Sequence, residues 1–232
     1  MGNIPIKVSP NPLISSTIEI RFKSNISKNN ILGIVYPMFI EDFPTLQDRG
    51  IPRISEDNPH FIANYIFTNK DYGLMIDNNV IAFECLNGYP LWGNYETIID
   101  KNINKLFSCI EIEKVERIGL RYINFFPNVK KISDATAINI TGFIPNGRLS
   151  NLNLQYLIDN CFINLQIQEN VYLEEDINKN TGLLIDIDIS QDNEIAISEV
   201  MTTINYLHEK EKLFFFELLS DAFKQNHIKI EY

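Results

Sequence analysis

The stretch V-E-R-I-G-L-R-Y-I-N-F-F, residues 115–126, decides the fold because apolar and polar residues alternate along it. Successive side chains of a strand point to opposite faces. Ile118 and Leu120 are therefore expected on a buried face, and Arg117 and Arg121 share the opposite face. The pattern predicts a half-buried strand that extends over residues 113–126.

The same alternation recurs in I-E-I-R-F-K, residues 18–23, and in L-I-D-I-D-I, residues 184–189. These stretches predict strands over residues 17–23 and 181–190. Further predicted strands are rich in β-branched and aromatic residues and cover residues 61–69, 72–86, 135–141, 162–175 and 228–232.

Apolar residues at helical spacing predict a first helix over residues 28–42, which is expected to kink or end near Pro37. Two further segments hold prolines: residues 1–12 predict an irregular lead-in, and residues 43–60 predict a loop or an edge excursion. Residues 151–160 fit neither a helix nor a strand unambiguously.

Two longer helices are predicted over residues 94–110 and 198–226, with Asn94 and Ser198 as their N-caps. Strands that cluster before a long helix, twice, predict an α+β fold with two mainly antiparallel sheets packed with long helices. No flexible linker separates the pseudo-repeated halves, residues 1–130 and 131–232, so one compact unit is expected.

The composition restricts the function. The chain has 232 residues and a net charge of −10, which disfavours nucleic acid as a partner because phosphate binding needs a basic face. Cys85, Cys109 and Cys161 are widely spaced, which indicates a reducing compartment rather than disulfides or zinc. Because no signal peptide or membrane-spanning run is recognised, a cytoplasmic location without membrane contact is expected.

Arg117 and Arg121 flank Gly119 on one strand face, which suggests a positively charged trough for an anionic ligand. Arg21, on the strand of residues 17–23, is expected to assist. The alternative is that Arg117 and Arg121 pair with carboxylates of a neighbouring strand.

Asp186 and Asp188 share a strand face, and two such carboxylates are candidate ligands for Mg²⁺ or Ca²⁺. Asp192 or Glu194 would supply a third ligand. The alternative is a solvated or salt-bridged strand face, and no cofactor is expected.

The last predicted helix carries an aromatic stretch that predicts either a core helix or an interface with a partner. The candidate interface residues are Phe214, Phe215, Phe216, Leu219 and Phe223. His208 lies on the same helix and is expected on its solvent-exposed side.

Four stretches carry a resemblance to a family: I-E-I-R-F (18–22), R-I-G-L-R-Y-I-N (117–124), L-L-I-D-I-D (183–188) and L-H-E (207–209), the last followed by Phe215 and Leu218. In this order and spacing they resemble a sporadically distributed family of uncharacterised bacterial proteins of similar length. The resemblance covers nearly the whole chain, and R-x-G-L-R-Y-x-N is its most specific part. It implies an accessory role on mobile or defence-associated genetic islands, with no catalytic residues to carry over.

No nucleophile elbow, P-loop, dinucleotide fingerprint or H-E-x-x-H motif occurs in the sequence, so an enzyme is not favoured. The leading hypothesis is a non-enzymatic binding or assembly protein, as an accessory component of a mobile-element or anti-phage defence operon. Its partner would be another protein or itself, as a homodimer. The alternatives are a nucleotide- or phosphate-sensing protein or phosphohydrolase with an arginine-lined cleft, and a self-assembling structural subunit.

Overall fold

The computed structural model describes residues 5, 7–50, 63–139, 150–173 and 180–231. Its strands are β1 (Lys7–Ser9), β2 (Leu13–Ser24), β3 (Thr45–Asp48), β4 (Tyr65–Thr68), β5 (Tyr72–Asp77), β6 (Val80–Cys85), β7 (Ile112–Pro127), β8 (Asn151–Ile158), β9 (Cys161–Tyr172), β10 (Thr181–Gln191) and β11 (Lys229–Glu231). Its helices are α1 (Ile31–Phe39), α2 (Trp92–Phe107), α3 (Ile132–Ala135), α4 (Val200–Leu218) and α5 (Asp221–His227), and a 3₁₀ turn, Ile197–Glu199, precedes α4.

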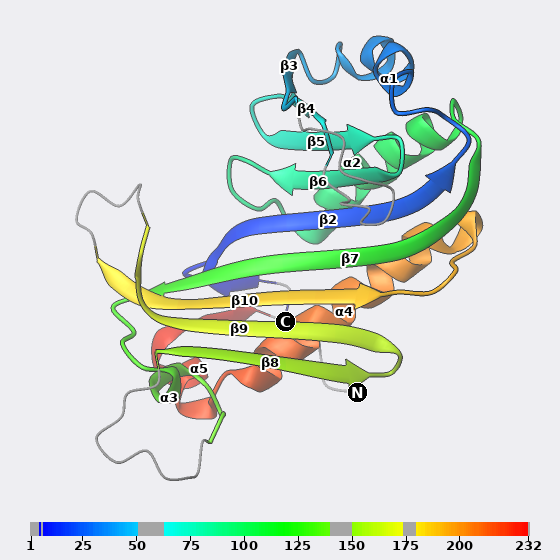
Figure 1. The fold of residues 1–232 in the computed structure, drawn as a ribbon. Helices are drawn as coiled ribbons and strands as arrows, with labels where there is room; N and C mark the ends of the chain where they lie inside the picture. Colours follow the sequence, from blue (N-terminus) through cyan, green and yellow to red (C-terminus); the bar gives the residue numbers. More distant parts are fainter. Residues whose placement is uncertain (1–4, 6, 51–62, 140–149, 174–179, 232) are drawn as a thin grey trace. The chain divides into compact units, whose positions relative to one another are not determined.

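The predicted α+β class is confirmed (Figure 1). A nine-stranded antiparallel sheet has the strand order β3-β4-β5-β6-β2-β7-β10-β9-β8, and β1 pairs with β11 in a small second sheet. Helices pack against the large sheet.

The chain divides into two compact units, each assembled from segments that are distant in sequence. The first unit comprises Met1–Ile14, Arg121–Ile189 and Tyr206–Tyr232, and the second comprises Ser15–Leu120 and Ser190–Asn205. β2, β7, β10 and α4 contribute residues to both. The halves expected from the sequence divide the chain differently, and their formation of one compact unit stays a prediction.

The second unit contains most of β2, which is the alternating strand predicted over residues 17–23, together with α1 and α2. Ile18 and Ile20 of β2 are fully buried, as the alternation requires. Phe22 of β2 meets Phe107 of α2 edge to face at 5.9 Å between ring centroids. The strand regions predicted over residues 61–69 and 72–86 contain β4, β5 and β6, which pair as two consecutive hairpins with register Tyr72↔Cys85 in the second.

The first unit is built on the hairpin of β8 and β9. Asp159 and Asn160 connect these strands with φ of 51° and 63°, the left-handed pair of a two-residue type I′ turn. α4 and α5 cover one face of this part of the sheet (Figure 1). The ring of Phe126 in β7 stacks on Phe215 of α4 at 6.4 Å and meets Phe223 of α5 at 5.1 Å.

The long helix predicted over residues 198–226 is wrong in its continuity, because it is divided into α4 and α5. Leu219 forms an isolated β-bridge with Thr136, and the Ser220 N–H donates to the Ala135 carbonyl. Ser220 then caps α5, since its hydroxyl accepts from the Phe223 N–H at 3.2 Å. A local cap and a tertiary bridge therefore outweigh the helical periodicity.

Both predicted N-caps are also wrong. α2 begins at Trp92, so Asn94 lies inside the helix and not at its cap. Ser198 lies inside the 3₁₀ turn, whose N-cap residue is Ala196. Neither element receives a side-chain capping bond. Leu91 and Ala196 are both extended, with ψ of 147° and 142°, so the chain turns into these elements before the predicted caps.

Three shorter segments also differ from their predicted structure. The lead-in of residues 1–12 is not wholly irregular, since β1 pairs with β11 in the register Lys7↔Glu231. The strand predicted over residues 135–141 is wrong in its described part, because α3 ends at Ala135, Thr136 forms an isolated β-bridge and residues 137–139 form no strand. Its last two residues lie outside the described residues. α1 continues past Pro37 to Phe39.

Within the described ranges, no helix has both the length and the apolar composition needed to cross a membrane.

Candidate functional site

In the second unit, Arg21 and Arg117 converge on one carboxylate. Glu19 Oε1 accepts from Arg21 Nε at 2.6 Å and from Arg117 Nη1 at 2.9 Å. The Arg117 Nε also lies 3.0 Å from Asp192 Oδ1. The two guanidinium groups are therefore neutralised by carboxylates of their own unit. For Arg117, whose partner Glu19 lies on the neighbouring strand β2, this is the alternative that the sequence left open.

The expected trough over Gly119 is filled by the protein itself. A β-carbon at Gly119 would lie 2.8 Å from Cζ and 2.9 Å from Nη2 of Arg117, so the guanidinium lies across the glycine. Glycine at this position leaves the room that the arginine needs. The expectation that Arg21 and Arg117 bind an anionic ligand stays a prediction, and the paired carboxylate works against it.

In the first unit, Arg121 and Asp186 form a bidentate ion pair. Arg121 donates from Nε to Asp186 Oδ1 at 3.0 Å and from Nη2 to Oδ2 at 2.6 Å. Asp186 is only 6% exposed, and its hydrogen bonds raise the pKa of Arg121. A paired fork of this kind fixes the orientation of both side chains.

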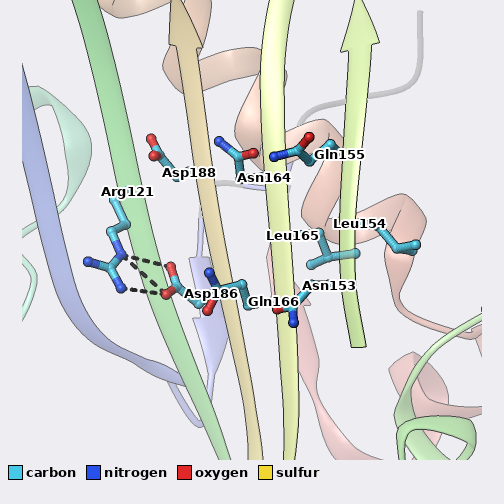
Figure 2. A pocket seen from close by; sticks show the side chains of 9 residues that line it. All are labelled: Arg121, Asn153, Leu154, Gln155, Asn164, Leu165, Gln166, Asp186 and Asp188. Atoms are coloured by element: carbon cyan, nitrogen blue, oxygen red, sulfur yellow. Dashed lines mark hydrogen bonds and ion pairs between the residues drawn. The ribbon is translucent and has the colours of Figure 1, made fainter. Parts of the chain in front are cut away.

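Beside this ion pair, the sheet carries a hollow of about 320 Å³, called here the amide hollow. Its lining residues come from β7, β8, β9 and β10 and are Arg121, Asn153, Leu154, Gln155, Asn164, Leu165, Gln166, Asp186 and Asp188. Figure 2 shows the polar side chains of β8–β10 in two rows that run across these strands. One row is Asp188, Asn164 and Gln155, and the other is Asp186, Gln166 and Asn153.

The strand register produces these rows. Gln155 lies directly opposite Asn164, and Asn153 lies directly opposite Gln166. Because side chains alternate, the residues between them point to the helix-covered face, where Leu165 is fully buried and Leu154 is half-buried. The pairing therefore assembles four carboxamides on one surface.

The electrostatics of the amide hollow are nearly neutral. One arginine and two aspartates among its lining residues leave a formal charge of −1. Among the described residues, the carboxamides of Asn153, Gln155, Asn164 and Gln166 make no hydrogen bond, so their donors and acceptors are available to a ligand.

An apolar pair continues the same surface. Leu157 and Phe162 lie directly opposite each other, two residues beyond Gln155 and Asn164 on the same face. Leu157 is 65% exposed and Phe162 is 46% exposed. The amide hollow is thus bordered by an exposed apolar row.

Asp186 and Asp188 line the hollow together, as the sequence predicted for a shared face. However, both oxygens of Asp186 accept from Arg121, and Asp192 pairs with Arg117 in the other unit. In the part of the chain that the structure describes, no group of three acidic, histidine or cysteine residues is arranged to hold a metal ion. The metal assignment stays a prediction.

Three of the candidate interface residues belong to the core of the first unit. Phe215, Leu219 and Phe223 are at most 6% exposed. Phe214 and Phe216 are half-buried, and Phe214 meets Tyr156 of β8 at 5.4 Å. An interface role stays a prediction for these two residues alone.

Two ionisable side chains of α4, those of His208 and Glu211, are buried, which the sequence did not predict. His208 is 8% exposed rather than on the solvent side, and its Nδ1 shares a hydrogen bond of 3.1 Å with the Tyr122 hydroxyl. One turn later, Glu211 is 5% exposed. Burial lowers the pKa of His208 to about 3 and raises the pKa of Glu211 to about 8. Both side chains are therefore uncharged at neutral pH.

No family model matches the chain, and no curated protein matches it. The fold defines the class, an α+β protein with a nine-stranded antiparallel sheet. The resemblance to a sporadically distributed bacterial family stays a prediction that rests on the quoted motifs.

Proposed function

We propose that this chain is a non-enzymatic assembly protein that joins a second copy of itself through the outer edge of β8. The supporting observation is the composition of that edge. Asn151–Ile158 holds no charged residue, no proline and no glycine. Within the described residues, β8 has β9 as its one strand neighbour. Long, uncharged strand edges pair readily with another chain.

The opposite edge of the sheet has the features that prevent pairing. β3 spans Thr45–Asp48, half the length of β8, and ends in Asp48 followed by Arg49. Short strands with charges are the usual protection of a sheet edge. The contrast between the two edges favours β8 as the contact surface.

The hydrogen-bonding pattern gives the direction of the main-chain groups on β8. The Glu169 N–H donates to the Ser150 carbonyl at 2.9 Å, so these residues form a hydrogen-bonded pair. Such pairs alternate along an antiparallel ladder, and the even-numbered residues of β8 therefore bond to β9. The residues that direct their N–H and C=O groups toward the outer edge are Asn151, Asn153, Gln155 and Leu157.

An antiparallel, two-fold symmetric contact uses all of these groups. When Leu154 lies on the symmetry axis, Asn153 faces Gln155 of the second copy, and Asn151 faces Leu157. Opposite residues then lie on the same face of the joined sheet. Leu157 is exposed, and burial of its apolar side chain at the contact would add a small stabilisation to that of the main-chain hydrogen bonds.

The alternative of a phosphate-binding protein has less support. Each arginine that was nominated for it, Arg21, Arg117 and Arg121, donates to a carboxylate. The cytoplasmic location and the accessory role in a mobile-element or defence operon are part of the proposal and rest on the sequence and its resemblance.

The experiment is sedimentation equilibrium of the wild type and of Gln155→Pro. Proline removes one outward N–H and leaves the bonds to β9 intact. We expect a wild-type dimer and a variant whose dimer dissociation constant rises at least about tenfold, because two symmetry-related contacts are lost. Gln155→Ala, which keeps the N–H, is the control and should dimerise normally.

A strictly monomeric wild type at millimolar concentration would refute the proposal, as would a Gln155→Pro variant that dimerises like Gln155→Ala. If Gln155→Pro does not fold, Asn153→Lys places a like charge near the symmetry axis in both copies and should weaken the dimer similarly. Capture of a different protein's strand by monomeric wild type would also count against self-assembly.

A further inference from the structure

We propose that the amide hollow binds a neutral, polyhydroxylated ligand, namely a short saccharide. This site goes beyond self-assembly, because it lies on the face of the sheet rather than on its edge. Strand pairing at the outer edge of β8 would leave the side chains of this face uncovered. The site and the dimer contact can therefore be tested separately.

The chemistry of the lining matches hydroxyl groups. A carboxamide offers donors and acceptors together, and a sugar hydroxyl is also both donor and acceptor. Two rows, each with one carboxylate and two carboxamides, cross β10, β9 and β8 (Figure 2). The rows are separated by two residues along each strand, which is about 7 Å. A ligand that bonds to both rows must carry hydroxyls along opposite edges, as a pyranose ring does.

The charge of the lining disfavours the other ligand classes. An anion would meet two aspartates and one arginine that already donates from Nε and Nη2 to Asp186. A hard cation would find Asp186 engaged by that same arginine. A neutral ligand is not repelled by the aspartates and does not need Asp186 to leave Arg121. The fixed Arg121–Asp186 pair presents oriented polar groups to such a ligand.

The adjoining apolar row supports the same ligand class. A sugar ring has a polar edge and an apolar C–H face, and aromatic rings contact such faces. Phe162 is 46% exposed and lies two residues from Asn164 on the same strand face. A saccharide that extends from the amide hollow would place its next ring over Phe162 and Leu157.

The size of the hollow limits the ligand. A volume of about 320 Å³ is at the lower end of the range for small-molecule sites. It fits one or two sugar rings. We therefore expect oligosaccharides of two or more units to bind, with dissociation constants in the millimolar to high micromolar range.

The test is titration of the protein with maltotriose, cellotriose and tri-N-acetylchitotriose, with binding followed by amide NMR shifts. Gln166 and Gln168 provide a matched pair, since both lie on the same face of β9 and Gln166 alone of the two lines the hollow. We expect at least one probe to saturate the wild type, with shifts at Asn164 and Gln166. Gln166→Ala should weaken that binding about tenfold, the effect of losing one good hydrogen bond, and Gln168→Ala should leave it within about twofold.

Phe162→Ala should weaken the trisaccharide more than the corresponding monosaccharide. The proposal is overturned if none of the three probes saturates at 20 mM (roughly the weakest binding of interest), or if Gln166→Ala and Gln168→Ala bind alike. Inorganic phosphate that binds more tightly than every saccharide, and loses its binding in Arg121→Ala, would also overturn it. A monomeric protein that still binds saccharide would refute the assembly proposal and retain this one.

Discussion

The guanidinium of Arg117 lies across Gly119, in the space that a β-carbon would occupy, with Cζ 2.8 Å from that position. Gly119→Ala must therefore displace the arginine from Glu19 and Asp192. The displaced group is the end of a flexible side chain, so we expect a modest destabilisation of about 1 kcal/mol in urea unfolding. Arg117→Ala should remove this cost, and Gly119→Ala in that background should be nearly neutral. Full additivity of the two substitutions would contradict the contact.

Gly182 in β10 has a different neighbour, and its substitution should be more damaging. A β-carbon there would meet the main-chain carbonyl of Phe126 and would lie 2.7 Å from Cζ of Phe125. Main chain in a sheet moves less easily than an arginine terminus. We expect Gly182→Ala to cost about 3 kcal/mol, at the upper end for overpacking. Equal unfolding midpoints for Gly182→Ala and Gly119→Ala would show that the strand adapts freely.

Ser220 is the helix cap that the structure shows, and Ser198 is the helix cap that the sequence predicted. Substitution of the two serines should therefore have different effects on stability. Ser220→Ala removes the acceptor of the Phe223 N–H and should cost about 1 kcal/mol. Ser198 makes no capping bond in the 3₁₀ turn, so Ser198→Ala should change stability by less than about 0.5 kcal/mol. The two variants can be compared by thermal unfolding. A larger loss for Ser198→Ala would mean that the helix begins where the sequence predicted.

These serines illustrate how far the sequence could predict the fold. Alternation located the strands around Ile18, Leu120 and Ile187, because burial of one sheet face is a local pattern. The division of the last helix was missed because it depends on the bridge between Leu219 and Thr136, which lie far apart in sequence. No local pattern contains such a contact.

The candidate site was predicted in part for the same reason. Asp186 and Arg121 were recognised as polar residues of neighbouring strands, and their pairing was one of the alternatives considered. The four carboxamides of β8 and β9 were not recognised, because asparagine and glutamine have no catalytic motif and are poor indicators of a strand. The signal available in the sequence was the alternation of amide and apolar residues in N-L-N-L-Q-Y, residues 151–156, and in I-N-L-Q-I, residues 163–167.

Glu211 gives a pH-dependent prediction. Its pKa is raised from 4.5 to about 8 because burial disfavours the charged carboxylate. Above pH 4.5 the unfolded chain loses this proton while the folded chain keeps it, so the free energy of unfolding falls as pH rises from 4.5 to 8. Glu211→Gln removes this loss. At pH 7 the variant should be more stable than wild type by roughly 3 kcal/mol, and below pH 4.5 the two should be similar. A variant that is less stable at pH 7 would show that the carboxylate is ionised and paired in the folded chain.

His208 has the opposite dependence. Its pKa is lowered from 6.5 to about 3, first by burial and then by the charge of Lys212. Below pH 6.5 the unfolded chain gains a proton that the folded chain excludes, so the free energy of unfolding falls as pH decreases toward 3. Between pH 4.5 and 6.5 this slope is opposed by the slope from Glu211, and the two contributions should nearly cancel in the wild type.

The single variants should expose the two slopes. In Glu211→Gln, stability should rise with pH across this window by about 1.4 kcal/mol per pH unit, from His208 alone. In His208→Gln, whose amide can still bond to the Tyr122 hydroxyl, stability should instead fall with pH by a similar amount. Urea unfolding at half-unit pH steps measures both, with the double variant as the control for other titrating groups. If stability changes with pH in the same way in both single variants, at least one of the two side chains is ionised in the folded chain. The prediction that both are buried in their uncharged forms would then be wrong.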